Sequence, residues 1–155
     1  MKTLDFLSEH IGISFQQSDS YGDWLGFEID SVKKEENKVI TSLLIRRDHV
    51  SPTGAVHGGV VSGFLDSSLG CAMVTIMDKG QMCSTVELNV KFFKPLSPGD
   101  KIIAESEVIH KGRTLCTVIA NVYKSDAPDI PVALATATFN RYQLKQQHKY
   151  SPAVM

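Results

Sequence analysis

The sequence predicts an α+β domain in which five to six antiparallel strands curl around one long central helix. The 155 residues, 43% of them hydrophobic and 21% charged, are enough for one ordinary core. Residues 58–77 contain no Lys, Arg or Glu and place apolar side chains at helical spacing. Four later segments alternate polar and apolar residues, and the turns between them are too short for parallel crossovers.

Shorter elements precede the long helix. Leu4, Leu7 and Ile11 lie at helical spacing, which predicts an accessory amphipathic helix. Two runs of strand character on either side of a polar turn predict a hairpin. In chain order, we expect the accessory helix within residues 3–13, a loop at 18–23, a strand at 24–32, a turn at 33–36 and a strand at 38–45.

The long helix follows a turn cluster at residues 51–54 and is expected to run from about Gly58 to Met77. Because it is apolar nearly all round, it belongs in the interior, with the rest of the chain wrapped around it. The stretch is also long enough to span a bilayer, but Asp66 would then lie near the bilayer centre at a cost of about 2.5–3.5 kcal/mol. The sequence therefore favours a buried helix in a protein without membrane contact.

Long strands are expected to form the wrapper around this helix. They are predicted at residues 82–93, 101–111, 114–124 and 131–142, with a turn at 125–130. In the first of them, alternation predicts one face of Ser84, Val86, Leu88, Val90 and Phe92 and another of Thr85, Glu87, Asn89 and Lys91. We expect a single domain of residues 1–142 and a frayed polar tail at 143–155.

The charge balance excludes several partners. Sixteen Lys and Arg against seventeen Asp and Glu leave a net charge of −1, so no global field attracts nucleic acid or anionic lipid. The cysteines Cys71, Cys83 and Cys116 have no metal-ligand spacing and are expected to be buried free thiols in a reducing cytosol. The first residues do not resemble a signal peptide, so a cytoplasmic location is expected. We also expect no metal site, and no serine nucleophile elbow is found.

Asp66 is the most informative single residue. An unpaired carboxylate in a buried helix costs several kcal/mol and is rarely kept without a use. Ser62, Gly63 and Gly70 remove bulk from the helix face around it, so a ligand can approach the carboxylate. The structural alternative is a helix-packing contact in which Asp66 bonds a neighbouring hydroxyl, and the residue alone leaves both readings open.

The sequence His57-Gly58-Gly59 stands at the start of the same helix. Glycines there expose backbone N–H groups without an intrahelical acceptor, and the helix dipole adds positive potential. Such a site can stabilise an oxyanion. The alternative for an isolated motif of this kind is a tight entry turn with His57 as a polar cap.

A resemblance brings these features together. The stretch HGGVVSGFLDSSLG, followed by STVELNVKFFKPLSPGD and HKGRTLCTVIANVYKSD, resembles the hotdog-fold acyl-CoA thioesterases of the phenylacetate-degradation (PaaI-like) type, in the superfamily of the 4-hydroxybenzoyl-CoA thioesterases. It covers roughly residues 24–142. It implies a hotdog fold, a homodimer or dimer of dimers, and hydrolysis of an aryl- or fatty-acyl-CoA, with coenzyme A as part of the substrate and no further cofactor.

The resemblance also assigns roles residue by residue. Asp66 matches the catalytic carboxylate, Gly58 matches the glycine whose N–H polarises the thioester carbonyl, and Thr85 matches a residue that positions the attacking water. Several relatives carry Asn six residues before the histidine, whereas this chain has the shorter Ser51. The substrate-binding residues expected are His57, Gly59, Ser51, Lys111 and Arg113. Lys111 and Arg113, like Lys91 and Lys94, lie on or beside strand ends where CoA phosphates could dock, although ordinary surface charge is the alternative for each.

Helix geometry adds an inference that needs no family. Gly58 and Asp66 are eight residues apart, which corresponds to roughly 12 Å along one helix. Both therefore cannot touch the same carbonyl. If both act on one thioester, they come from two subunits, and dimerisation becomes a catalytic requirement.

Other functions remain to be separated. Asp66 can serve as general base on water or as nucleophile, and the sequence does not distinguish these routes. A hydratase on acyl thioesters would pair a histidine with a carboxylate in a different motif, which is not found. A non-catalytic acyl-CoA-binding or sensor protein is the alternative from another class. The acyl group itself is beyond the reach of the sequence.

Overall fold

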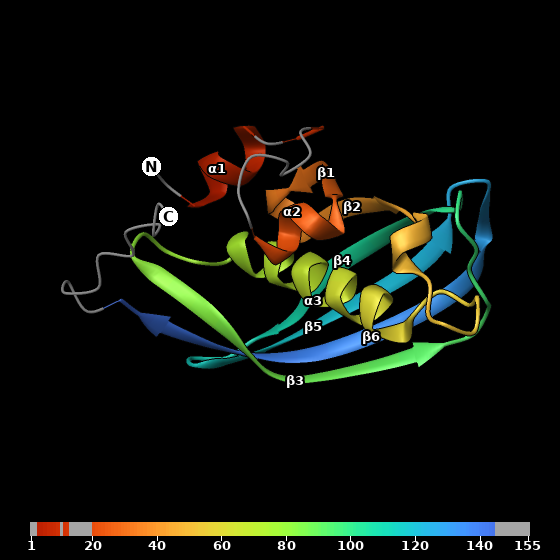
Figure 1. The fold of residues 1–155 in the computed structure, drawn as a ribbon. Helices are drawn as coiled ribbons and strands as arrows, with labels where there is room; N and C mark the ends of the chain where they lie inside the picture. The colour runs from red at the N-terminus through yellow and green to blue at the C-terminus, as the bar shows by residue number, and fades with distance from the viewer. Residues whose placement is uncertain (1–2, 10, 13–19, 145–155) are drawn as a thin grey trace.

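The computed structural model describes residues 3–9, 11–12 and 20–144 and confirms the predicted α+β hotdog architecture (Figure 1). Within these residues, six antiparallel strands form one sheet in the order β1-β2-β4-β5-β6-β3. The helices are α1 (Thr3–Glu9), α2 (Tyr21–Leu25) and α3 (Gly58–Val74), with 3-10 turns η1 (Lys34–Glu36) and η2 (Arg47–His49). The strands are β1 (Phe27–Lys33), β2 (Lys38–Leu44), β3 (Gln81–Phe92), β4 (Lys101–Lys111), β5 (Leu115–Lys124) and β6 (Ala127–Gln143).

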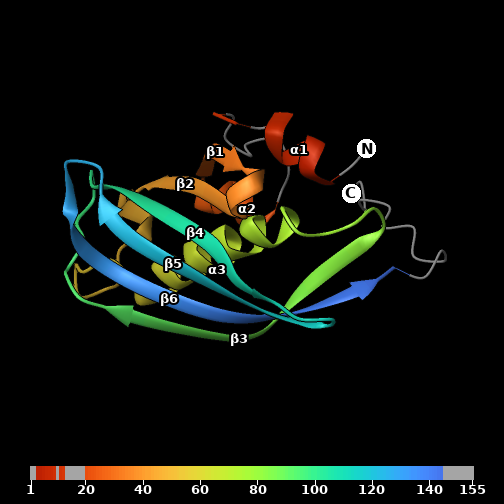
Figure 2. The ribbon, with the colours of Figure 1, turned by 180° about the vertical axis from the view of Figure 1, so that it is seen from behind.

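The long helix α3 lies on the concave side of the curved sheet, and the view from behind shows the strands in front of it (Figure 2). Its buried face carries Phe64, Leu65 and Leu69, all fully excluded from solvent. A buried hydrogen bond of 2.7 Å joins Ser68 of α3 to Thr41 of β2. Apolar packing and this bond together set the rotation of α3 about its own axis.

The opposite face of α3 is only partly covered in the single chain. Its half-exposed residues form one continuous stripe of small and polar side chains: Ser62, Gly63, Asp66, Ser67, Gly70 and Cys71. The expectation that the helix is enclosed nearly all round, with Asp66 buried, is therefore wrong for one chain. The absence of large apolar side chains on this stripe means that little free energy is lost by leaving it open.

Residues 21–25 form the helix α2, where a loop running into a strand was predicted. Ser20 is the N-cap, and its hydroxyl and the Asp23 side chain make a reciprocal capping box. Gly26 ends the helix in the left-handed region with φ of 73°. The sequence contains the residues that define this helix: the capping Ser20, the acidic Asp23 three positions later and the terminal Gly26. Because Ser, Asp and Gly are also typical turn residues, the same residues predict a loop.

Other boundaries also differ from the expectation. The accessory helix ends at Glu9, and Ile11 instead forms an isolated parallel bridge with Ile29. Helix α3 ends at Val74 rather than Met77, because the next amides turn to acceptors three residues back. Strand β6 begins at Ala127, so the expected turn at 125–130 is shorter than predicted.

Strand β3 carries a β-bulge that the alternation did not reveal. Thr85 pairs with Phe139 and Glu87 with Thr138, so Val86 has no partner and is 60% exposed. The extra residue reverses the alternation. Thr85 therefore faces α3 together with the later residue Leu88, and the predicted faces are wrong for Ser84, Val86 and Thr85.

Strand β6 ends at Gln143, one residue beyond the strand end expected at 142. Gln143 belongs to β6, and the Leu144 N–H donates to the Gly80 carbonyl at 2.9 Å, so the first residues of the expected tail are ordered. The remainder of that tail, residues 145–155, lies outside the described residues. Among the helices that the structure describes, none has the length and apolar character needed to cross a bilayer.

Candidate active site

The loop before α3 folds back on itself. Val50 and Val56 form an antiparallel bridge, and the His57 N–H donates to the His49 carbonyl at 2.9 Å. Gly54 closes the turn with φ of 87°, a conformation that favours glycine. Ser51 lies inside this closed loop, where its hydroxyl is 2.7 Å from that of Thr53.

The entry to α3 leaves one backbone donor available. His57 is the N-cap, and its Nδ1 accepts a hydrogen bond of 2.9 Å from the Gly59 N–H. The Val60 N–H donates to the His57 carbonyl. Among the described residues none accepts from the Gly58 N–H, and Gly58 is exposed. His57 thus acts as the cap, and the Gly58 amide remains free to stabilise an anionic oxygen at the positive end of the helix dipole.

Asp66 and Thr85 meet in the structure. The Thr85 hydroxyl donates to Asp66 Oδ1 at 2.8 Å, from β3 to the half-exposed stripe of α3. The bond exists because the bulge turns Thr85 towards the helix. A carboxylate oriented by a hydroxyl and open to solvent on one side is suited to hold or activate a water molecule.

The thiols beside this pair are not activated. Burial, followed by the charge of Asp66, raises the pKa of Cys83 to about 11, and burial raises the pKa of Cys71 to about 12. A thiolate is the nucleophilic form of cysteine, and these groups stay protonated at neutral pH. Neither thiol is therefore a ready nucleophile beside Asp66.

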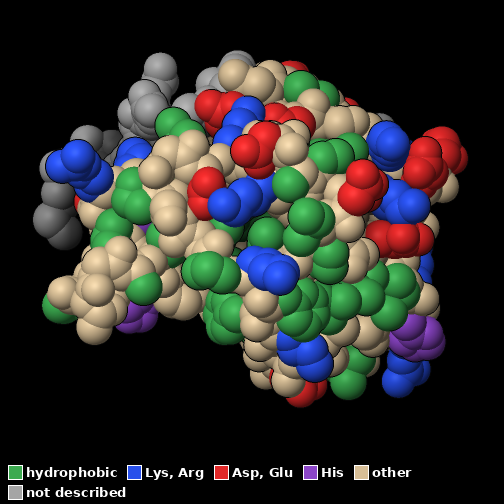
Figure 3. Space-filling model, turned by 90° about the vertical axis from the view of Figure 1, so that its right-hand side faces the viewer, with side chains coloured by type: hydrophobic (Ala, Val, Ile, Leu, Met, Phe, Trp, Pro, Cys, Tyr) green, Lys and Arg blue, Asp and Glu red, His purple; other side chains and the backbone are tan. Residues whose placement is uncertain are grey.

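Gly58 opens on a cavity of about 310 Å³ between α3 and the end of β3. Phe92 and Leu96 contribute to its largely apolar lining, and Lys94 supplies a cation. Figure 3 shows this end of the molecule, where Lys and Arg side chains stand singly rather than in one cluster. An anionic ligand here would be held by a few placed cations, which fits the near-neutral charge of the chain.

Lys111 and Arg113 lie at the other end of the molecule. Lys111 ends β4 and Arg113 lies in the turn to β5, which Arg141 ties to the segment just after α3 by donating to the carbonyls of Ile76, Gly112 and Arg113. Within one chain they are therefore remote from Gly58. The structure brings His57, Gly59 and Ser51 to the Gly58 end, pairs Asp66 with Thr85 in the middle of α3, and separates the two predicted cations from Gly58.

Comparison with known proteins identifies the family. Residues 53–130, half of the chain, match the family model of the thioesterase superfamily. The chain belongs to this superfamily. Human acyl-coenzyme A thioesterase 13 is 25% identical over 88 residues, which are 57% of this chain and 62% of that protein. The chain spans less than two thirds of the length of the first curated relatives that it matches.

Solved structures of the superfamily show the same fold. A phenylacetic acid degradation-related protein from Ralstonia eutropha superposes with a TM-score of 0.71 at 25% identity, over 79% of this chain and 90% of that one. A thioesterase from Pseudomonas aeruginosa gives a TM-score of 0.76 at 22% identity, over 91% and 94%. PaaI from Thermus thermophilus gives 0.70 at 22% identity, over 80% and 100%.

Three residues near the start of α3 were not predicted from the sequence to line a cavity. Tyr21 and Trp24 of α2 and His49 of η2 line a second cavity with His57 and Gly59. The capping box that forms α2 and the loop that closes on His49 are local features, whereas the contact between Trp24 and His49 joins segments distant along the chain. The capping signal alone could have placed Tyr21 and Trp24 on a helix.

Proposed function

We propose that this protein is an acyl-CoA thioesterase that hydrolyses the thioester of an aryl- or fatty-acyl-CoA. The observation that carries the proposal is the hydrogen bond from Thr85 to Asp66, which orients a partly exposed carboxylate on α3. The unpaired Gly58 N–H supplies the oxyanion donor that thioester hydrolysis requires. Membership of the thioesterase superfamily supports the same reaction.

In the mechanism, Asp66 accepts a proton from water as the water oxygen attacks the thioester carbonyl. The carbonyl oxygen becomes negative and is stabilised by the Gly58 N–H and the helix dipole. The C–S bond then breaks, and the CoA thiolate takes up the proton. In the nucleophilic route, Asp66 attacks the carbonyl itself, and the C–S bond breaks as CoA thiolate leaves. Water then hydrolyses the resulting anhydride, which regenerates the carboxylate and releases the proton that the thiolate takes up; the same residues serve both routes.

A second copy of the chain completes the proposed site. Eight residues separate Gly58 from Asp66, roughly 12 Å along α3, so one carbonyl cannot reach both groups of the same helix. The edge strand β3 presents exposed apolar side chains, among them Met82 and Val86, to a partner. We propose a homodimer or dimer of dimers in which Gly58 of one subunit faces Asp66 of another.

The setting of the reaction is part of the proposal. The three cysteines are free, which suits a reducing cytoplasm. A single domain of residues 1–142, extended by the last residue of β6, would carry all the proposed groups, and each complete site would combine groups of two subunits. Coenzyme A enters as part of the substrate, and the reaction as written needs no other cofactor. Docking of the CoA phosphates on Lys111 and Arg113 would require those residues to come from a neighbouring subunit.

The Asp66→Asn variant tests catalysis against mere binding. We expect kcat/KM for acyl-CoA hydrolysis to fall by about 10²–10⁴-fold, the range for loss of a general base. Affinity for a non-hydrolysable acyl-CoA thioether, measured by calorimetry, should stay within about threefold because the side-chain shape is kept. Asp78→Asn, which removes an exposed carboxylate elsewhere, is the matched control and should retain full activity.

Two results would contradict the proposal. If the Asp66→Asn variant hydrolysed acyl-CoA at the wild-type rate, the carboxylate would have no part in the mechanism. Wild-type protein that binds the thioether but hydrolyses no aryl, short-chain or medium-chain acyl-CoA would instead support the non-catalytic sensor protein.

A further inference from the structure

Gly63 leaves room for a hydroxyl group one helical turn from Asp66. Gly63 lies inside α3, where glycine is less favourable than alanine because its backbone loses more freedom on folding. A β-carbon at this position would clash with the Tyr21 hydroxyl, which is its nearest neighbour, ahead of the ring carbon Cζ at 2.8 Å. The glycine therefore admits the tip of the Tyr21 side chain, a group that the mechanism above does not use.

Helix geometry sets this hydroxyl close to the carboxylate. Gly63 and Asp66 are three residues apart on α3, so their β-carbon positions lie about 5–6 Å from each other on one face. Side chains of a helix lean towards its N-terminus, and the Asp66 carboxylate therefore leans towards the turn that carries Gly63. A gap of this size between a carboxylate and a hydroxyl is one that a single water molecule can bridge.

Both groups have hydrogen-bonding capacity to spare. Thr85 donates to Oδ1 of Asp66, and no described residue donates to Oδ2. The Tyr21 hydroxyl likewise has no hydrogen-bond partner among the described residues, and Tyr21 is 54% exposed. Water is the partner open to both groups, since solvent reaches each of them. Thr85 of β3 and Tyr21 of α2 thus leave room for one water molecule beside the free oxygen of the carboxylate.

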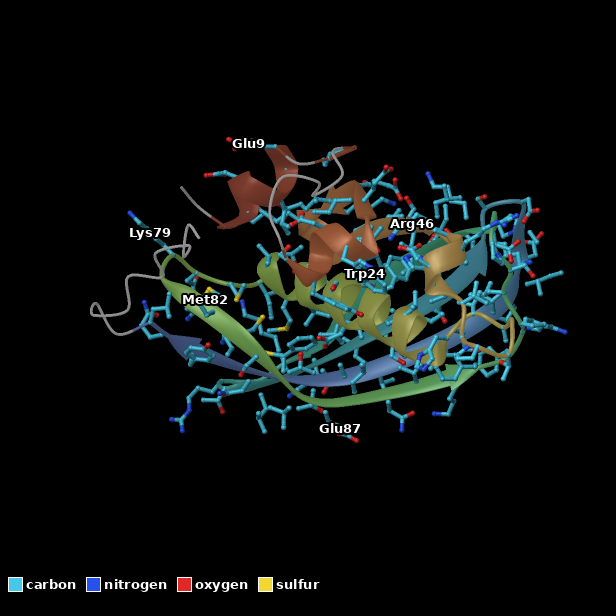
Figure 4. All side chains as sticks on the ribbon, in the orientation of Figure 1. Glu9, Trp24, Arg46, Lys79, Met82 and Glu87 are labelled. Carbon is cyan, nitrogen blue, oxygen red and sulfur yellow. The ribbon has the colours of Figure 1, made fainter. Side chains whose placement is uncertain are left out.

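The attachment of α2 to the domain does not need the Tyr21 hydroxyl. Leu25 is fully buried, and Arg46 donates to the carbonyls of Trp24 and Leu25 at the end of α2. Figure 4 shows Trp24 and Arg46 beside the start of α3. Phenylalanine would pack α2 against α3 as well as tyrosine does, so packing alone does not account for a hydroxyl at the point of closest approach.

We propose that Tyr21 is a further catalytic residue, whose hydroxyl holds the attacking water together with Asp66. The proposal rests on the proposed thioesterase function. The water gives one proton to Oδ2 of Asp66 as its oxygen bonds to the carbonyl carbon, and its second O–H donates a hydrogen bond to Tyr21. Tyr21 neither gains nor loses a proton in this step. In the nucleophilic route, the same hydroxyl holds the water that attacks the anhydride.

Tyr21→Phe removes the hydroxyl and keeps the ring. We expect kcat for acyl-CoA hydrolysis to fall roughly three- to tenfold, the effect of one hydrogen bond. KM and the affinity for the non-hydrolysable thioether should change by less than about twofold, because the contact is with water rather than with substrate. The stoichiometry of the thioether titration gives the fraction of competent enzyme. Tyr142→Phe, which removes another part-exposed tyrosine hydroxyl on β6, is the matched control and should leave kcat unchanged.

A series of acyl groups distinguishes contact with water from contact with substrate. Hydrolysis of acetyl-CoA, hexanoyl-CoA and benzoyl-CoA is followed by the release of CoA thiol in wild type and in Tyr21→Phe. A hydroxyl that holds water lowers kcat by the same factor on every ester that wild type hydrolyses, because water is common to all of them. A hydroxyl that touches the acyl group would give factors that differ between esters, together with weaker thioether binding.

Gly63→Ala tests the position of the hydroxyl without altering Tyr21 itself. The added β-carbon displaces the hydroxyl, so kcat should fall roughly three- to tenfold in the wild-type background. In a Tyr21→Ala background the hydroxyl is already absent, and Gly63→Ala should change kcat by less than about twofold. Equal losses in the two backgrounds would mean that the methyl group itself is harmful, and would overturn the assignment of Gly63 as the place of the hydroxyl.

The proposed function and the role of Tyr21 fail in different ways. If Tyr21→Phe keeps the wild-type kcat while Asp66→Asn loses activity, or if its losses follow the acyl group and the thioether affinity, the role of Tyr21 is overturned and the thioesterase function stands. If wild type hydrolyses no aryl, short-chain or medium-chain acyl-CoA, the function is overturned and the role of Tyr21 with it.

Discussion

At the residue scale, the site depends on which hydrogen bonds are already used. His57 accepts from the Gly59 amide, and no described residue accepts from that of Gly58, so the helix cap leaves Gly58 as the proposed oxyanion donor. Thr85 occupies one oxygen of Asp66 and leaves the other for water. In the proposed mechanism, the helix start and the helix carboxylate are the two complementary halves of the hydrolytic site.

Thr85→Val tests the role of its hydroxyl. Valine has the same shape but cannot donate to Asp66, so we expect kcat to fall about tenfold with KM changed less than about threefold. Thr85→Ser keeps the donor and should stay within about threefold of wild-type kcat. Steady-state kinetics on the best acyl-CoA measures both, and equal losses in the two variants would refute a hydroxyl-specific role.

At the element scale, the bulge in β3 decides which side chains of that strand face α3. Cys83 and Thr85 face α3 before the bulge, and Leu88 and Val90 face it afterwards. Without the extra residue, one of these groups would point to the other side of the sheet. The bulge therefore allows one strand to place the Thr85 hydroxyl on the Asp66 carboxylate and, further along, to pack apolar side chains against α3.

Deleting Val86 removes the bulge. We expect kcat/KM to fall at least as far as in Thr85→Val, and the free energy of unfolding to fall by about 2 kcal/mol or more, because a strand segment must reverse its faces. Val86→Thr keeps the chain length at a 60% exposed position and should change stability by less than about 0.5 kcal/mol. Urea unfolding and kinetics test the pair; a fully active deletion variant would show that the bulge is dispensable.

At the scale of the whole molecule, one chain holds all the proposed groups but cannot bring them to a single carbonyl. The free Gly58 amide and the Asp66–Thr85 pair lie about eight residues apart on one rigid helix. A two-fold arrangement of chains would form two equivalent sites, each from complementary halves. Oligomerisation would then control activity directly rather than through stability.

Mixing two inactive variants tests this arrangement. Gly58→Pro removes the N–H, and proline at the first helical position is well tolerated; His57, with φ of −68° and ψ of 129°, already has the backbone that precedes proline. Combined with Asp66→Asn after subunit exchange, it should restore about a quarter of wild-type activity, since half of the dimers would carry one intact site in two. Gly58→Ala keeps the N–H, and its β-carbon would meet Phe92 at 3.5 Å, an ordinary contact.

One outcome of the mixing experiment would contradict a site shared between subunits. If mass spectrometry shows hybrid dimers and activity still does not return, Gly58 and Asp66 do not share a site across subunits. Gly58→Ala should retain most activity, and a loss as large as that of Gly58→Pro would assign the effect to bulk rather than to the missing donor.

The sequence by itself determined the features that depend on local periodicity and spacing. The helix from Gly58, the long alternating strands and the distance from Gly58 to Asp66 all follow from the regular rise and facing of residues along one element. The same spacing identifies His57, Gly58 and Asp66 as candidate site residues from the sequence alone. These residues and the fold class needed no information from distant parts of the chain.

Only the tertiary structure decided the features that depend on contacts between distant segments. The direction of Thr85 depends on a bulge set by pairing with β6, and the exposure of Asp66 depends on which face of α3 the sheet covers. The joining of Trp24 to His49 and the remoteness of Arg113 from Gly58 are likewise consequences of chain packing. Periodicity is a property of neighbouring residues, whereas the site is assembled by burial and pairing across the whole domain.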